Sequence, residues 1–128
     1  MSFTEAPAQP SLMHPADSLF EKGQYFEASI EYERALFSHP AHDARIRCRY
    51  RKALCYRYLG RYQDALDEIN RIGLFNTDKS WKNILLYEKA FNLLLSGSEQ
   101  EALMHMGMIR KERLSDTMRR QIIPLKIL

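Results

Sequence analysis

The chain superposes on itself when it is shifted by 37 residues, and this internal repeat limits its possible folds more than any other feature. Small residues recur in three columns, namely Ala16, Ala53 and Ala90, then Gly23, Gly60 and Gly97, then Ala28, Ala65 and Ala102. Large apolar residues recur between these columns, at Leu19, Tyr56 and Leu93 and at Tyr32, Ile69 and Met106. Their helical spacing predicts that each unit is a pair of helices.

The small residues have distinct expected roles in such a pair. The first alanine lets two helices approach closely, and the glycine ends the first helix in a turn that needs a positive φ. The second alanine lies where the returning helix crosses. We therefore predict six helices in three antiparallel hairpins, over residues 11–42, 43–79 and 80–114, with all six alanines buried.

Capping residues support these boundaries. Asp43 is predicted to begin a helix that runs to about Leu59, Thr77 or Asp78 one to about Leu95, and Ser98 with Glu101 one to about Arg113. Residues 1–10 are polar and rich in proline, which predicts a disordered arm. Residues 115–128 are expected to form a C-terminal capping helix or the start of a truncated further repeat.

Two segments, LGRYQDAL at residues 59–66 and KGQYFEA at residues 22–28, resemble the turn of the tetratricopeptide repeat (TPR). The resemblance covers about residues 11–114, and the first unit fits best. It departs at Pro15, where a large apolar residue is usual, and the period of 37 exceeds the family's period of about 34. The resemblance implies an all-α, right-handed superhelical array of hairpins, or α-solenoid, that acts as a protein-binding scaffold.

In that family the first helix of each hairpin lines a concave groove that binds the ligand. The resemblance places in this groove Arg47, Tyr50, Leu54, Arg57 and Tyr58 from the middle unit, Ile84, Tyr87, Phe91, Leu94 and Leu95 from the third, and Met13, Asp17, Phe20 and Glu21 from the first. Such an aromatic and apolar surface with two arginines suits a protein or peptide that offers hydrophobic anchors and an acidic group.

The sequence offers no motif for catalysis. It lacks a glycine-rich phosphate loop, a Cys-x-x-Cys pair and a nucleophile elbow, so we expect neither an enzyme nor a cofactor. His39, His42 and Asp43 could be drawn as a metal site, but a proline-containing loop between repeats explains them better, and no metal is expected. No apolar stretch is long enough to span a membrane.

Two other functions remain open from the residues. Between Ala44 and Gln63 lie seven basic residues and no acid, interleaved with four tyrosines, a combination that can hold RNA; the basic residues are Arg45, Arg47, Arg49, Arg51, Lys52, Arg57 and Arg61. Against RNA binding, the carboxylates of Glu27, Glu31 and Glu33 could pair with several of them. Alternatively, the apolar C-terminal end could join two copies as a homo-oligomer, in a chain that is a module of a larger protein.

Cys48 and Cys55 lie seven residues apart in one predicted helix, which separates them by about 10 Å and prevents a disulfide between them. Free thiols favour a reducing, cytoplasmic compartment, although export after removal of a leader would also fit. The formal net charge of +3 does not name a partner.

Overall fold

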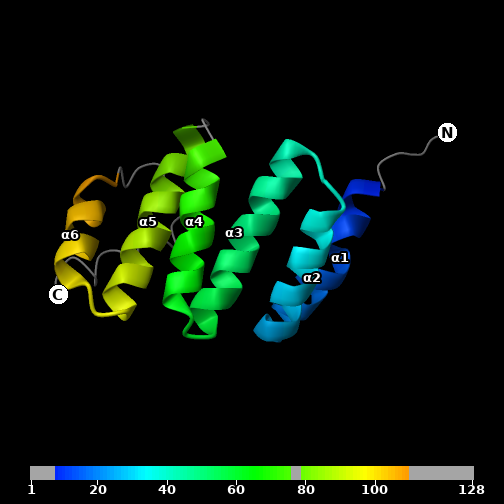
Figure 1. Ribbon diagram of the computed structural model, residues 1–128, viewed down its shortest axis with the longest axis horizontal. Coiled ribbons are helices and arrows are strands. Elements are labelled where there is room, and N and C mark those ends of the chain that lie inside the picture. The colour runs from blue at the N-terminus through cyan, green and yellow to red at the C-terminus, as the bar shows by residue number, and fades with distance from the viewer. Residues whose placement is uncertain (1–7, 76–78, 110–128) are drawn as a thin grey trace. The chain divides into compact units, whose positions relative to one another are not determined.

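The computed structural model describes residues 8–75 and 79–109, in which all regular secondary structure is helical (Figure 1). The six helices are α1 (Ala8–Glu21), α2 (Tyr25–Phe37), α3 (His42–Tyr58), α4 (Tyr62–Phe75), α5 (Lys79–Leu95) and α6 (Glu99–Gly107). The predicted all-α class is thereby confirmed. Within the described residues, no helix has the length and apolar character needed to cross a membrane.

The three glycines of the repeat end α1, α3 and α5 in the same way. Gly23, Gly60 and Gly97 have φ angles of 79°, 78° and 95°, as the sequence predicted. In the first turn the N–H of Gly23 donates to the carbonyl of Phe20 at 3.0 Å, and that of Gln24 donates to Leu19 at 2.9 Å. The same two bonds recur at the other two turns, and together they form the Schellman pattern that satisfies the last helical carbonyls.

The six alanines of the repeat are all buried, with exposed fractions between 0% and 2%, which confirms the prediction. An alanine occupies little space, so the backbones of the crossing helices can pack closely without a cavity between them. The repeat read from the sequence is therefore present in the local structure of every hairpin.

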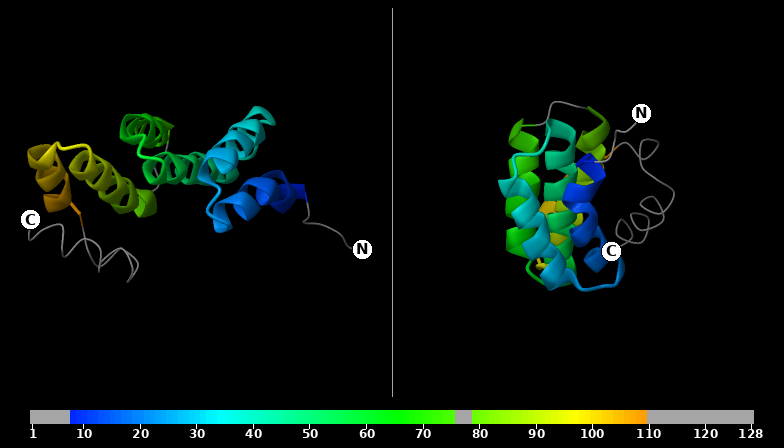
Figure 2. Two further views of the ribbon diagram at one scale, coloured as in Figure 1. Left: turned by 90° about the horizontal axis from the view of Figure 1, so that it is seen from below. Right: turned by 90° about the vertical axis from the view of Figure 1, so that its right-hand side faces the viewer.

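The chain divides into two compact units, a first unit of residues 1–68 and a second unit of residues 69–128, with the boundary inside α4. In the first unit α2 packs against both α1 and α3, and in the second unit α5 packs against α6 (Figure 2). The core of the first unit consists of Met13, Ala16, Ala28, Tyr32, Ala35, Ala44, Cys48 and Cys55. The core of the second unit includes Tyr87, Ala90, Met106 and Ile109.

Several predicted boundaries were wrong. Helix α1 begins at Ala8, so residues 8–10 are helical instead of belonging to a disordered arm. Its interior accommodates Pro15, whose side chain is exposed. Residues 1–7 and 110–128 lie outside the described part, and with them the predicted C-terminal capping helix.

Two predicted caps also differ from the structure. Ala41 is the N-cap of α3, so Asp43 lies in the first helical turn, where its negative charge still favours the helix N-terminus. Ser98 is the N-cap of α6, but its side chain makes no capping hydrogen bond. Helix α6 ends at Gly107 and not near Arg113. The predicted caps Thr77 and Asp78 are outside the described residues.

Candidate functional site

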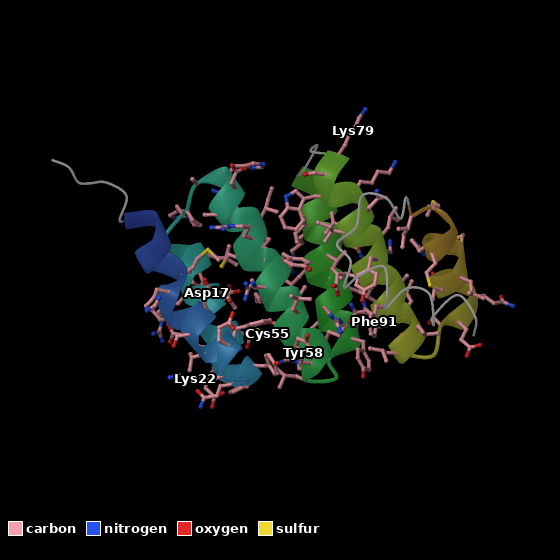
Figure 3. All side chains as sticks on the ribbon, turned by 180° about the vertical axis from the view of Figure 1, so that it is seen from behind. Asp17, Lys22, Cys55, Tyr58, Lys79 and Phe91 are labelled. Atoms are coloured by element: carbon pink, nitrogen blue, oxygen red, sulfur yellow. The ribbon has the colours of Figure 1, made fainter. Side chains whose placement is uncertain are left out.

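Three aromatic side chains meet at the turn end of the first unit. The rings of Tyr25 and Tyr58 stack with centroids 4.5 Å apart and planes 18° from parallel. Phe20 meets their edges at centroid distances of 5.4 Å and 6.3 Å. Phe20 lies in the last turn of α1, Tyr25 begins α2 and Tyr58 ends α3, so the Gly23 turn brings the first two together. Figure 3 labels Tyr58 at the end of α3. Its side chain remains 52% exposed.

Two arginines of α3 extend this group, and we call the five residues the aromatic-arginine cluster. The guanidinium carbon of Arg51 lies 4.6 Å from the Phe20 ring centroid, and that of Arg57 lies 5.0 Å from the Tyr58 centroid. Guanidinium groups at such distances are attracted by the negative ring faces. The Nη1 atom of Arg51 is buried and has no hydrogen-bond partner among the described residues. The cluster thus combines half-exposed aromatic rings with positive charge.

The cluster contains part of the predicted groove. Arg57, Tyr58 and Phe20 were predicted from the sequence and belong to it, whereas Tyr25 and Arg51 were missed. The turn at Gly23 was the available signal for Tyr25, because a tight turn returns the chain to the end of α1. Of the other predicted residues in the middle unit, Arg47 is exposed, and Tyr50 and Leu54 are half-buried.

In the second unit the predicted groove residues are placed differently. Ile84, Phe91 and Leu94 are half-buried and Leu95 is 44% exposed, but only 1% of Tyr87 is exposed. The Tyr87 ring meets Phe91 edge-on at 5.7 Å and belongs to the core between α5 and α6. The predicted role of Tyr87 as a ligand anchor is therefore wrong, because the side chain that α6 covers cannot also face a groove.

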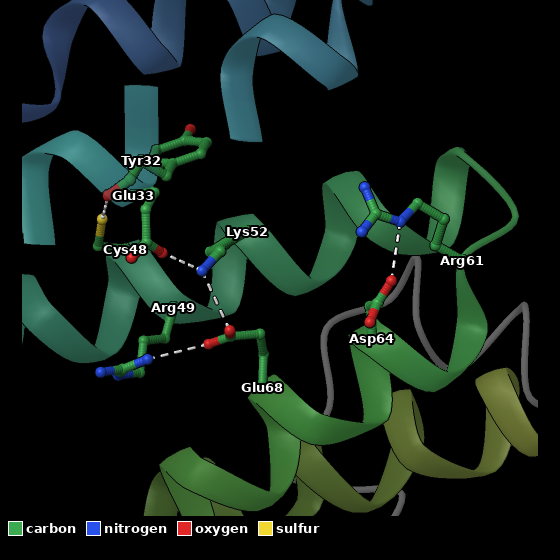
Figure 4. Close-up of polar contacts among 8 residues, drawn as sticks. All are labelled: Tyr32, Glu33, Cys48, Arg49, Lys52, Arg61, Asp64 and Glu68. Atoms are coloured by element: carbon green, nitrogen blue, oxygen red, sulfur yellow. Dashed lines mark hydrogen bonds and ion pairs between the residues drawn. The ribbon is translucent and has the colours of Figure 1, made fainter. Parts of the chain in front are cut away.

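The basic stretch of α3 is partly neutralised by an ion-pair cluster of Glu33, Arg49, Lys52 and Glu68 (Figure 4). Glu68 of α4 accepts from Arg49 and from Lys52, each at 3.1 Å, and Glu33 of α2 also pairs with Lys52. The side chains of Lys52 and Glu68 are only 7% and 4% exposed. Burial lowers the pKa of Lys52, but the hydrogen bond to Glu33 and the charge of Glu68 outweigh it, so the pKa is raised overall.

This cluster only partly matches the expected pairing of arginines with the preceding helix. Of the three carboxylates named from the sequence, Glu33 reaches the basic helix, while Glu31 pairs with Arg34 in its own helix at 3.0 Å. Glu68, which was not predicted from the sequence, pairs with two of the basic residues. Arg61 pairs with Asp64 at 2.8 Å, so Arg49, Lys52 and Arg61 all have carboxylate partners.

The interior of the first unit also holds a buried tyrosine and two buried thiols. Tyr32 donates a hydrogen bond to Asp17, and burial together with this bond raises the pKa of Tyr32. Burial raises the pKa of Cys48 and of Cys55 to about 12, and the Cys48 thiol donates to the Tyr32 carbonyl at 3.1 Å. Both thiols are thus protonated at neutral pH, and a protonated thiol is a poor nucleophile.

The histidines named from the sequence do not form a cluster in the structure. His39 follows α2 with a φ of 52°, and His42 is the first residue of α3. Among the described residues, no group of three or more His, Cys, Asp or Glu side chains is arranged to hold a metal ion.

Protein-family models, curated proteins and solved structures were all compared with the chain, and none matches it. No relative therefore indicates a function, and support for one in the first unit comes from the aromatic-arginine cluster and the ion-pair cluster.

Proposed function

We propose that this protein is a non-catalytic scaffold of the tetratricopeptide type that binds a partner protein or peptide through the aromatic-arginine cluster. The observation that carries the proposal is Tyr58, which is 52% exposed although it is stacked on Tyr25. Tyrosine and arginine are among the residue types enriched at the few positions that dominate the affinity of protein interfaces. The three alike glycine turns support the assignment to helical-hairpin repeats.

The chemistry of the cluster also indicates which kind of partner segment would fit it. Tyr58 is held by stacking, so little rotamer freedom is lost when a ligand covers it. Arg57 adds a planar, permanently charged group that binds carboxylates through paired hydrogen bonds. The partner segment should carry an aromatic or large aliphatic residue next to an acidic residue. Arg47, exposed on the same helix, can contact a second acidic group.

The test compares Tyr58→Ala with Phe26→Ala in capture of a partner from nuclease-treated lysate. Phe26 is 53% exposed on α2 and makes no ring contact with the cluster, so its substitution is a matched control. We expect Tyr58→Ala to weaken the affinity for the captured partner at least tenfold, or by about 2 kcal/mol, and Phe26→Ala to leave it unchanged. Equal capture by both variants would argue against the aromatic-arginine cluster as the binding site.

RNA would use the same arginines and tyrosines in a different way. Its binding would disappear on nuclease treatment and fall steeply with salt, because counterions are released from neutralised phosphates. The carboxylate partners of Arg49, Lys52 and Arg61 favour a protein ligand, since those three cations are already neutralised. Self-association through the C-terminal end would appear as a concentration-dependent mass in sedimentation, without any captured partner.

A further inference from the structure

The second unit contains a pocket of about 600 Å³ that the proposed function does not use. It lies among α4, α5 and α6, and we call it the lysine pocket. Ile69, Leu74, Leu85, Leu86 and Met108 provide apolar lining. Lys79, Lys82 and Lys89 of α5 provide positive charge, and no acidic residue lines the pocket among the described residues. Its volume lies in the range typical of ligand sites.

The 37-residue repeat explains why this pocket exists. Adding 37 to the four residues of the ion-pair cluster yields Asn70, Leu86, Lys89 and His105, and all four line the lysine pocket. The lysine is retained at this position, but both carboxylates are replaced, Glu33 by Asn70 and Glu68 by His105. Neither repeat position that supplies a carboxylate to Lys52 in the first unit supplies one to Lys89 in the second.

A second substitution in the repeat widens the pocket. Leu36 packs against the core of the first unit, whereas its counterpart in the second unit is Gly73, which lines the pocket. A Cβ atom added to Gly73 would meet no atom of the described residues within 4 Å. The space that a leucine fills in the first unit is thus left open in the second.

The positions of the lysines indicate the shape of a ligand. Lys82 and Lys89 are seven residues apart on α5, or about 10 Å along the helix, and Leu85 and Leu86 lie between them. Side chains on one face of an extended peptide recur at every second residue, so two acidic residues four positions apart, or about 13 Å, with a large apolar residue midway between them would reach both lysines. An amphiphile with a single charged head would match only one of the two lysines.

The C-terminal residues of the chain itself do not complement this charge. Residues 110–128 include six basic side chains and two acidic ones, so the pocket and this segment carry charge of the same sign. Charge complementarity instead favours an acidic segment of another protein.

We infer that the lysine pocket is a second binding site, in which an acidic peptide segment of a partner protein inserts large aliphatic side chains between carboxylates that pair with Lys82 and Lys89. The site is separate from the aromatic-arginine cluster. It would therefore be filled whether or not that cluster binds its own ligand.

The experiment measures binding of an acetylated and amidated fluorescent peptide, EELLEE, to the full chain by anisotropy. The control peptides are QQLLQQ, which lacks charge, and EESSEE, which lacks apolar side chains. We expect EELLEE to bind at least tenfold more tightly than either control, since both the charge and the apolar contact contribute. Equal affinities for EELLEE and QQLLQQ, or for EELLEE and EESSEE, would overturn the inference.

Protein variants then locate the site. Gly73→Leu fills the pocket without changing charge, and Lys82→Glu combined with Lys89→Glu reverses the charge without filling it. Each should weaken EELLEE binding at least tenfold, whereas two substitutions outside both proposed sites, Lys22→Glu at an exposed lysine of the first unit and Phe26→Ala, should leave it within twofold. Loss of binding with Tyr58→Ala would instead assign the peptide to the aromatic-arginine cluster.

Circular dichroism checks the fold of each variant. If Gly73→Leu does not fold, the charge-reversed variant decides the question by itself. Two further outcomes would overturn the inference. If decanoate binds the pocket while EELLEE does not, the site accepts a small amphiphile and the inference of a peptide site is wrong. Unchanged EELLEE binding in both pocket variants would also overturn it.

Discussion

The same repeat positions are used in opposite ways in the two units. In the first unit Glu33, Arg49, Lys52 and Glu68 form a network in which each cation meets a carboxylate and in which Lys52 and Glu68 are buried. In the second unit the corresponding residues, Asn70, Leu86, Lys89 and His105, line an open pocket. The small residues that set helix packing are thus needed in every unit of the repeat. The residues at the positions between the helices can differ, so that they form ion pairs in one unit and line a pocket in another.

The largest expected effect tests the ion-pair cluster of the first unit. Glu68→Gln would leave Arg49 without its carboxylate and Lys52 with only Glu33, in surroundings where Glu68 itself is 4% exposed. We expect a loss of about 3 kcal/mol in the free energy of unfolding, because removing one partner of a buried ion pair leaves the buried Lys52 with one carboxylate instead of two. Urea denaturation measures this loss.

The counterpart of Glu68 provides the control for that measurement. His105→Gln should cost less, because the imidazole makes one hydrogen bond, from Nδ1 to the Glu101 carbonyl, and pairs with no carboxylate among the described residues. Equal losses in the two variants would show that the ion-pair cluster does not distinguish the units.

The close helix crossings that both units share can be tested at the buried alanines of the repeat. Ala65 and Ala102 are both 0% exposed at equivalent positions. Replacement of either by leucine should overpack the helix crossing and cost about 1–3 kcal/mol, which thermal or chemical unfolding would detect. A stable Ala65→Leu variant would contradict the close helix crossing there.

Two buried thiols should make the stability of the first unit depend on pH. Because burial raises the pKa of Cys48 and Cys55 to about 12, they stay protonated in the folded chain while the unfolded thiols ionise above about pH 9. The stability they contribute is complete below pH 9 and is lost as the pH rises towards 12, by about 1 kcal/mol per thiol at pH 10.

Chemical denaturation at pH 8 and pH 10 measures this loss. The variant with both cysteines replaced by alanine should lose less stability between the two pH values than the original chain does. If the two proteins lose the same amount, ionisation of the unfolded thiols is not the cause.

The smallest expected effect concerns the lysine pocket of the second unit. Gly73→Ala should stabilise the chain by about 0.5–1 kcal/mol, because alanine has the higher helix propensity and its Cβ would meet no atom of the described residues within 4 Å. The corresponding Leu36→Ala should destabilise it, since Leu36 packs against the first core. Thermal unfolding of both variants compares the signs, and a destabilised Gly73→Ala variant would mean that no space exists beside this glycine.

Much of the fold could be predicted from the sequence, but less of the candidate site. The six helices and the glycine turns followed from local spacing, and three residues of the aromatic-arginine cluster, Phe20, Arg57 and Tyr58, had been predicted as groove residues from the family resemblance. Tyr87 was assigned to a groove because the family resemblance was transferred to a unit where that position lies in the core. Tyr25 and Arg51 were missed because their contacts depend on how three helices meet.

The sequence by itself determined the features that a single turn or helix crossing requires. A positive φ favours glycine and a close helix crossing favours alanine, so the roles of Gly60 and Ala65 could be predicted without knowledge of the rest of the chain. Only the tertiary structure decided which charges are neutralised and where space remains. Lys52 and Lys89 occupy equivalent positions, but the carboxylates or the cavity beside each come from other helices, and sequence periodicity does not fix those distances.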